Sequence, residues 1–382
     1  MVGAVLWAAA DVISDGVIGE HSPSTMKSSS DQSASSDIEA ATQVLDLLSD
    51  TKEDTMRTKR EKDGGGSAHH KDKDSDTKLS GEQDALISGA VMLLCGAFLH
   101  YYYGTAHIVS FYAHDHMAPN GLPMIPPNTV YIAAFVSGIF QAFSLIYLLK
   151  AFESSSSTII VPLMQLNSLF VLPMSIVLSV LSHYFPTLST FDQIISPVHF
   201  LAFVLIFIGG FYPAIEGEWS QFSRSFWRQP AVTQVILSDF LIAIYYLIVS
   251  FCTNETGGMT SMSFLVISIY GNATTFLFLV VFVGRYRRSA NELLVMRPKY
   301  ILLSSLGEMF SMSGYFFVSI SYHLYYNSGV VSATEGALNQ LFNLLLAIFL
   351  KKVFNFGREV KRIREKLYSC AIVSVGLVLT ST

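Results

Sequence analysis

The amino-acid sequence predicts an all-α membrane protein with ten transmembrane helices, arranged as two inverted five-helix repeats. Three observations predict this fold class: long apolar blocks, a regular alternation of basic segments with those blocks, and short patterns shared by the two halves. Of the 382 residues, 51% are hydrophobic and only 14% are charged, whereas soluble domains carry about 25% charged residues. A helix needs about 20 mostly apolar residues to cross a hydrocarbon core of about 30 Å, and such stretches recur along most of the chain.

Ten blocks are long and apolar enough to be spans. Each span must be helical, because the lipid interior offers no hydrogen-bond partners to the backbone. The first block carries Asp11 and Asp15 and lacks the basic flank of a signal peptide, so we interpret it as a span. The predicted spans are 2–19, 85–103, 130–149, 158–181, 199–213, 232–251, 262–283, 300–322, 329–350 and 367–382.

These spans divide the chain into four parts. Residues 1–19 form the first transmembrane helix. Residues 20–84 form an insert rich in Ser, Asp, Lys and Gly, and we expect it to be disordered because it carries too little apolar surface to offset the cost of ordering. Residues 85–214 complete the first five-helix repeat, and residues 231–382 form the second.

Every one of the 24 Lys and Arg residues falls on one side of the predicted membrane. That side receives the insert and the connections after the third, fifth, seventh and ninth spans. Cytoplasmic loops carry excess Lys and Arg, so the insert should face the cytoplasm. The other face holds the glycosylation sequon Asn254-Glu255-Thr256. We expect a multi-pass protein of the plasma membrane or a eukaryotic endomembrane, with the lipid bilayer as a partner. The pattern predicts no nucleic-acid partner and specifies no oligomeric state.

The two halves share local patterns. The motif L-N-x-L-F occurs at residues 166–170 and again at residues 338–342. Asp11 and Asp239 lie near the middle of the first and sixth spans. Because each half has an odd number of spans, its two copies would insert in opposite directions. Inverted repeats of this kind build many secondary transporters, with a binding site near the membrane midplane.

The five-plus-five plan, the short connection between the third and fourth spans and the glycine-containing last helix resemble the drug/metabolite transporter superfamily (EamA-like). The segment YLLKAFESSSSTIIVP, residues 147–162, is also similar to the corresponding stretch of the magnesium-transporter branch known as NIPA. The resemblance covers the ten spans and omits the insert. It implies a ten-helix carrier that works by alternating access. The long insert and the predicted extracytoplasmic C-terminus depart from the usual plan of that superfamily.

Polar side chains inside the spans give the candidate binding residues. A charged group at the bilayer centre costs about 2.5–3.5 kcal/mol on insertion scales, so an acid in a span is a candidate functional residue. No Lys or Arg lies at comparable depth, which disfavours phosphate-bearing substrates. The predicted substrate- or proton-binding residues are Glu308, Glu335, Asp239, Asp11, Asn339, Gln141 and Gln165.

Three roles for these acids remain open: binding a cationic substrate, carrying a coupling proton, or forming structural hydrogen bonds with neighbouring helices. The leading expectation is a transporter that moves a small cationic or neutral metabolite by alternating access, with proton coupling as an option. The alternatives are a divalent cation (magnesium) transporter and a non-transporting membrane scaffold. No HExxH or GxSxG motif occurs, so we predict no enzymatic activity, no metal site and no cofactor.

Overall fold

The computed structural model describes residues 6, 8–11, 13, 79–105, 108, 124–155, 160, 163–164, 167–185, 188, 191, 197–214, 227–296, 298–324, 328–354 and 363–380. Within these residues the regular secondary structure is helical and contains no strand beyond a single-residue bridge, which confirms the all-α class. Gln165 and Asp15 lie outside the described residues, as do residues 20–78 of the insert.

Five helices in the described part are long and apolar enough to cross a membrane. This indicates an integral membrane protein that crosses the bilayer several times. Each of the five lies where the sequence predicts a span. They are α3 (Gly81–Tyr103), α5 (Pro127–Ser154), α10 (Pro230–Thr253), α11 (Ser261–Phe282) and α13 (Pro298–Leu324).

Further helices coincide with the remaining predicted spans. Described residues between 6 and 13 are helical, in agreement with a helix in the first block. The others are α7 (Asn167–Ser182), α8 (Pro197–Ala214), α14 (Ser328–Phe354) and α15 (Ile363–Thr380). The total of ten spans and the inverted repeat stay predictions.

Helix α3 starts at Gly81, whereas the sequence analysis begins this span at Ala85 and leaves Asp84 in the insert. The reason is a capping box at the helix start. The hydroxyl of Ser80 accepts a hydrogen bond from the backbone of Gln83 at 3.3 Å, and the side chain of Gln83 accepts one from the backbone of Ser80 at 2.9 Å. The ordered chain therefore includes residues 79–84.

Helix α12 (Gly284–Leu293) was not predicted, because its sequence is basic and contains no apolar block. It buries one face, which carries Tyr286 and Ser289. Tyr286 joins an apolar cluster that includes Leu149 and Phe152 of α5.

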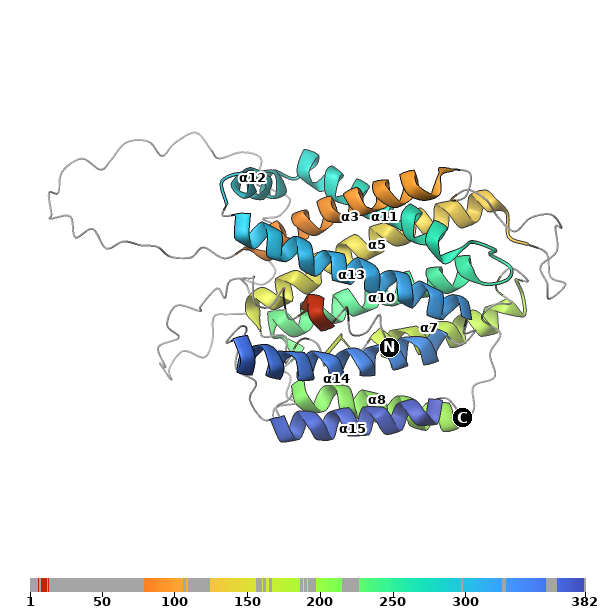
Figure 1. The fold of residues 1–382 in the computed structure, drawn as a ribbon. Coiled ribbons are helices and arrows are strands. Elements are labelled where there is room, and N and C mark those ends of the chain that lie inside the picture. Colours follow the sequence, from red (N-terminus) through yellow and green to blue (C-terminus); the bar gives the residue numbers. More distant parts are fainter. Residues whose placement is uncertain are drawn as a thin grey trace, which may run out of the picture. The chain divides into compact units, whose positions relative to one another are not determined.

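The charged ends of several helices meet near α12. The carboxylate of Glu82, at the start of α3, lies 2.6 Å from Arg285 Nε of α12. It also lies 3.6 Å from the Nζ atom of Lys150, near the C-terminal end of α5. Glu82 is buried although both partners are more exposed. The start of α3, the end of α5 and helix α12 thus lie at the same end of the bundle (Figure 1).

Helix α5 packs closely against α11 and α10. A Cβ atom built on Gly138 would lie 1.8 Å from the carbonyl oxygen of Ser268, and one on Gly271 would lie 1.9 Å from that of Phe135. The two backbones therefore touch, as small residues allow in membrane bundles. On the other side of α5, the hydroxyls of Ser144 and Ser238 lie 2.9 Å apart, and each also donates to the other residue's carbonyl.

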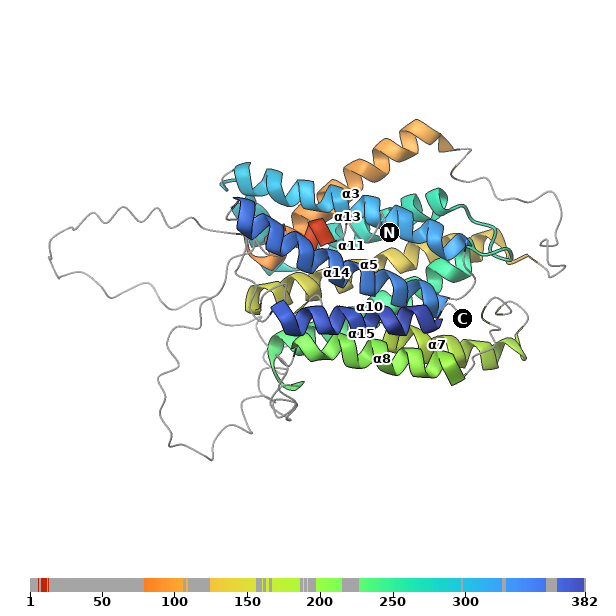
Figure 2. The same ribbon diagram turned by 60° about the horizontal axis from the view of Figure 1, so that its bottom comes forward.

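Helices α8 and α15 lie side by side in both views (Figures 1 and 2). Ser369 of α15 donates a hydrogen bond to the carbonyl of Gly209 of α8, and Val373 also contacts that glycine position. Helix α14 packs against both α15 and α7.

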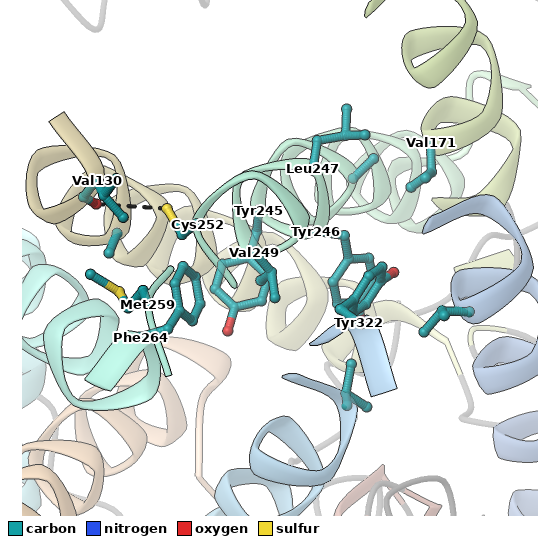
Figure 3. Close-up of a cluster of buried hydrophobic side chains, with 14 of the residues drawn as sticks. Val130, Val171, Tyr245, Tyr246, Leu247, Val249, Cys252, Met259, Phe264 and Tyr322 are labelled. Carbon is teal, nitrogen blue, oxygen red and sulfur yellow. Dashed lines mark hydrogen bonds between the residues drawn. The ribbon is translucent and has the colours of Figure 1, made fainter. Parts of the chain in front are cut away.

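An aromatic cluster fills the space between α10, α11 and α13 (Figure 3). The rings of Tyr246 and Tyr322 stack with their centroids 5.3 Å apart, and Tyr245 meets Phe264 edge to face at 5.8 Å. Just beyond α10, the side chain of Asn254 accepts hydrogen bonds from Thr256 Oγ1 at 2.8 Å and from the backbone of Gly257 at 2.6 Å.

Candidate functional site

A cavity lies in the interior of the bundle, lined by α3, α5, α7, α10, α13, α14 and the helical residues near position 10. It offers about 80 Å³ to the centres of water-sized molecules. One water needs about 10–15 Å³ on this measure, so the cavity holds roughly five to eight waters or a small solute. Its lining includes five carboxyl groups: Asp11, Asp84, Asp239, Glu308 and Glu335.

Most of the predicted binding residues line this cavity. The carboxyl-bearing candidates Asp11, Asp239, Glu308 and Glu335 do so, as does the amide-bearing Asn339. Gln141 is not in the lining, although its side chain is buried in α5. The prediction for Gln165 lies outside the described residues.

The α14 side of the cavity presents Glu335 and Asn339, which are one helical turn apart. The phenol of Tyr246 donates to Glu335 Oε1 at 3.0 Å, and the amide of Asn339 donates to Asp11 Oδ2 at 3.2 Å. Glu335 is 7% exposed. Its Oε2 atom has no hydrogen-bond partner among the described residues.

Helices α3 and α13 also contribute acids to the cavity lining. Ser304 of α13 donates a hydrogen bond to Asp84 Oδ1 of α3. Ser88 and Glu308 lie one helical turn further along α3 and α13 and line the same cavity. Each helix thus carries one acid and one serine four residues apart, and Ser304 of α13 binds the acid of α3. Both acids are at most 5% exposed, and Glu308 Oε1 has no hydrogen-bond partner in the described part of the chain.

Asp239 enters the cavity from α10 and is 1% exposed. Its Oδ2 atom has no hydrogen-bond partner among the residues that the structure describes. The preceding residue, Ser238, holds α10 to α5 through Ser144, which fixes the depth of Asp239 in the bundle.

The predicted site residues did not include several residues that line the cavity, among them Asp84 and Asn167. Asp84 follows a long polar run and was assigned to the insert. The signal that places it in a helix is Ser80 followed by Gln83 directly before an apolar run. Asn167 belongs to the first L-N-x-L-F motif, whose second copy supplies Asn339. The cavity therefore brings together both asparagines of the motif and both of the acids, Asp11 and Asp239, that the predicted repeat relates.

The acid–base groups in the described lining of the cavity are strongly biased toward acids. Five acids line it, and none of its described lining residues is Lys, Arg or His. A buried carboxylate without a counter-charge is costly, so each needs a proton or a bound cation. Among the described residues, no three His, Cys, Asp or Glu side chains are grouped so as to hold a metal ion.

Comparison with known proteins adds no family to these observations. The sequence matches no protein-family model, and no functionally characterised protein matches it. The resemblance to the drug/metabolite transporter superfamily therefore rests on the residues quoted for it above.

Proposed function

We propose that this protein is a membrane carrier that moves a small cationic solute by alternating access. The observation that carries the proposal is the set of five carboxyl groups on one buried cavity whose described lining contains no basic side chain. In a low-dielectric interior such a site favours cations strongly over anions, and over neutral solutes as well. A non-transporting scaffold has no need for these costly buried acids.

Apolar layers close the cavity on two sides. Leu148, Leu149 and Phe152 of α5 line one side and belong to the apolar cluster that includes Tyr286. Tyr246 lines another side and stacks on Tyr322 in the aromatic cluster of Figure 3. A solute can reach the acids only when one of these layers opens, which is the motion that alternating access requires.

The packing of the helices supports an inverted repeat. A twofold axis in the membrane plane would exchange α3 with α11, α5 with α13, α7 with α14 and α8 with α15. A helix that lies next to this axis is expected to contact the helix with which the axis exchanges it. Helix α3 packs against α11, α7 against α14 and α8 against α15. The contact of α5 with α11 likewise has its mate in the contact of α13 with α3.

The experiment measures binding and transport by the full-length protein. The purified chain is screened by thermal unfolding against methylammonium, guanidinium, choline, magnesium and sulfate, because a bound ligand raises apparent stability by mass action. Ions that stabilise it are then tested for uptake into proteoliposomes. We expect an organic cation to stabilise the protein and to be taken up, and sulfate to do neither.

Matched variants locate the site. Glu335→Gln removes a cavity charge but keeps an acceptor for Tyr246, so we expect cation binding and uptake to fall at least tenfold. Glu365→Gln, in the first turn of α15 and outside the cavity lining, should behave like the wild type. Uptake of magnesium alone would favour the divalent-cation alternative, and a protein stabilised by none of the ions would favour the scaffold.

A further inference from the structure

We infer that the solute is a cation with several N–H donors, and that Glu335 and Asn339 of α14 accept hydrogen bonds from it. This inference rests on the proposed function and names its substrate class. The observation behind it is the kind of polar atom left without a partner in the cavity lining. Among the described lining residues these atoms are four buried oxygens, and none of them is a donor: Asp239 Oδ2, Glu308 Oε1, Glu335 Oε2 and Asn339 Oδ1.

The residues that carry these oxygens are almost completely buried, since each is at most 7% exposed. A buried acceptor without a donor has lost the hydrogen bonds that water gives it in the unfolded chain, and this loss is costly. A ligand that brings its own N–H groups restores those bonds. The lining therefore favours a ligand that donates several hydrogen bonds over one that donates none.

Contacts within the protein orient Glu335 and Asn339 for this task. The phenol of Tyr246 donates to Glu335 Oε1 at 3.0 Å, which leaves Oε2 without a partner in the described part of the chain. The amide nitrogen of Asn339 donates to Asp11 Oδ2 at 3.2 Å. Because an ionised carboxylate can only accept, this bond sets the amide so that its oxygen is left over. Side chains four residues apart on a helix have Cβ atoms about 5–6 Å apart, so one small cation can donate to both.

Neither a proton nor water meets the needs of both residues. A proton can neutralise Glu335, but the amide of Asn339 does not titrate and still lacks a donor. Water can donate to either oxygen, but it brings no charge to compensate a buried carboxylate. An organic cation with N–H groups supplies the charge and the donors in one molecule.

A metal ion suits this lining less well than an organic cation does. Magnesium demands oxygens in near-octahedral geometry at about 2.0–2.1 Å. The four oxygens come from α10, α13 and α14, and no metal-holding group of acids, His or Cys occurs among the described residues. Hydrogen bonds from N–H groups reach about 2.9 Å, and one cation can direct several of them toward different helices.

An aromatic cage for a quaternary ammonium ion is the other alternative. The tyrosine rings of the lining are already engaged with other rings. Tyr246 stacks on Tyr322 with centroids 5.3 Å apart, and Tyr315 meets Tyr245 edge to face at 5.9 Å. A quaternary ion would also leave the two oxygens of α14 without donors. Sites that hydrogen-bond an N–H group reject analogues that lack it, so the donors should set the selectivity.

Isomeric alkylammonium ions test the inference on the wild-type protein. The ions tert-butylammonium and tetramethylammonium have the same formula and charge, but the first has three N–H donors and the second has none. Each is titrated against the purified full-length chain, and its dissociation constant is taken from the rise in unfolding temperature with concentration. Each unsatisfied buried acceptor weakens binding by about tenfold. We therefore expect tetramethylammonium to bind about a hundredfold more weakly, and equal constants overturn the inference.

A smaller pair of isomers covers the case in which both of these ions are too large for the cavity. Isopropylammonium has three N–H donors and trimethylammonium has one. Trimethylammonium can satisfy only one of the two oxygens, so it should bind about tenfold more weakly than its isomer. Equal binding of this pair again overturns the inference.

Variants of α14 assign the acceptor. Asn339→Leu removes the neutral acceptor, so the preference for tert-butylammonium should fall from about a hundredfold to about tenfold. Asn343→Leu is the matched control: both asparagines are 3% exposed, but Asn343 is not in the described cavity lining, so it should keep the full preference. An unchanged preference in Asn339→Leu contradicts the role of Asn339. Where a variant does not fold, the wild-type comparison decides.

The outcomes separate this inference from the proposed function. Equal binding of the isomers overturns the inference and leaves a cation carrier standing. The expected preference in a protein that takes up none of these ions into proteoliposomes supports the donor-binding site and contradicts the carrier. A protein that binds none of the isomers overturns both proposals.

Discussion

The close contact of α5 with α11 leads to a prediction about stability. In Gly138→Ala the new Cβ atom would lie 1.8 Å from Ser268 O, which is 1.2 Å short of the 3.0 Å that real Cβ atoms keep. The obstacle is backbone, so the helices themselves must move apart. A gap of 0.5–1 Å already forfeits a quarter to a half of each dispersion contact. Overpacking commonly costs 1–3 kcal/mol, and we expect about 3 kcal/mol here.

The same interface supplies an internal check. Gly271→Ala places a Cβ atom 1.9 Å from Phe135 O and should cost a similar amount. One separation of the helices relieves both clashes, so the double variant should lose about 3–4 kcal/mol rather than the sum of about 6. Gly284→Ala is the matched control, because no heavy atom lies within 4 Å of its new Cβ. It should stay within about 0.5 kcal/mol of the wild type.

The assay is reversible unfolding of the purified variants in mixed micelles of increasing SDS content, followed by circular dichroism. A Gly138→Ala protein within about 0.5 kcal/mol of the wild type would refute the backbone contact. Additive losses in the double variant would show that the two glycines do not share one interface.

Three further predictions concern the site and its surroundings. Tyr246→Phe leaves Glu335 Oε1 without its donor and should cost about 1–3 kcal/mol of unfolding free energy; a neutral result in the same SDS assay would contradict the bond. Arg285→Ala leaves the buried carboxylate of Glu82 with the more distant Lys150 and a long hydrogen bond from Ser289, so it should destabilise more than the double variant with Glu82→Gln, by about 1–3 kcal/mol; equal stabilities would mean that the ion pair contributes nothing. Burial raises the pKa of Tyr286 from 10.0 to about 12, so its contribution to stability is complete below pH 10 and is lost as pH rises through about 12; alkaline titrations of unfolding should show a smaller loss for Tyr286→Phe than for the wild type.

The positions of the helices follow from the sequence because burial in lipid imposes length and apolarity on each span. The predicted span 262–283 coincides with α11 (Ser261–Phe282), and the predicted span 232–251 lies within α10 (Pro230–Thr253). Helix α12 was not predicted because it lies outside the apolar blocks from which the spans were identified. Its stability comes from burying Tyr286 against α5 rather than from an apolar block of its own.

Acids inside apolar blocks were found because the cost of burying them sets them apart from their neighbours. Their convergence on one cavity needed the tertiary structure. Asp84 shows the limit most clearly, since its partner Ser304 lies 220 residues away. Local sequence patterns do not predict a hydrogen bond between residues that far apart in the chain. The bond becomes apparent only once α3 and α13 are seen to be neighbours.

The turn after α10 has a consequence for modification of the chain. The sequon asparagine, Asn254, is 8% exposed, and its side-chain oxygen already accepts bonds from Thr256 and Gly257. Glycosylated sequon asparagines lie in surface loops. A sugar can therefore be attached only while the nascent segment is still open, and once attached it would prevent the turn from closing. Glycosylated and non-glycosylated chains would therefore differ in the fold of this turn as well as in the attached sugar.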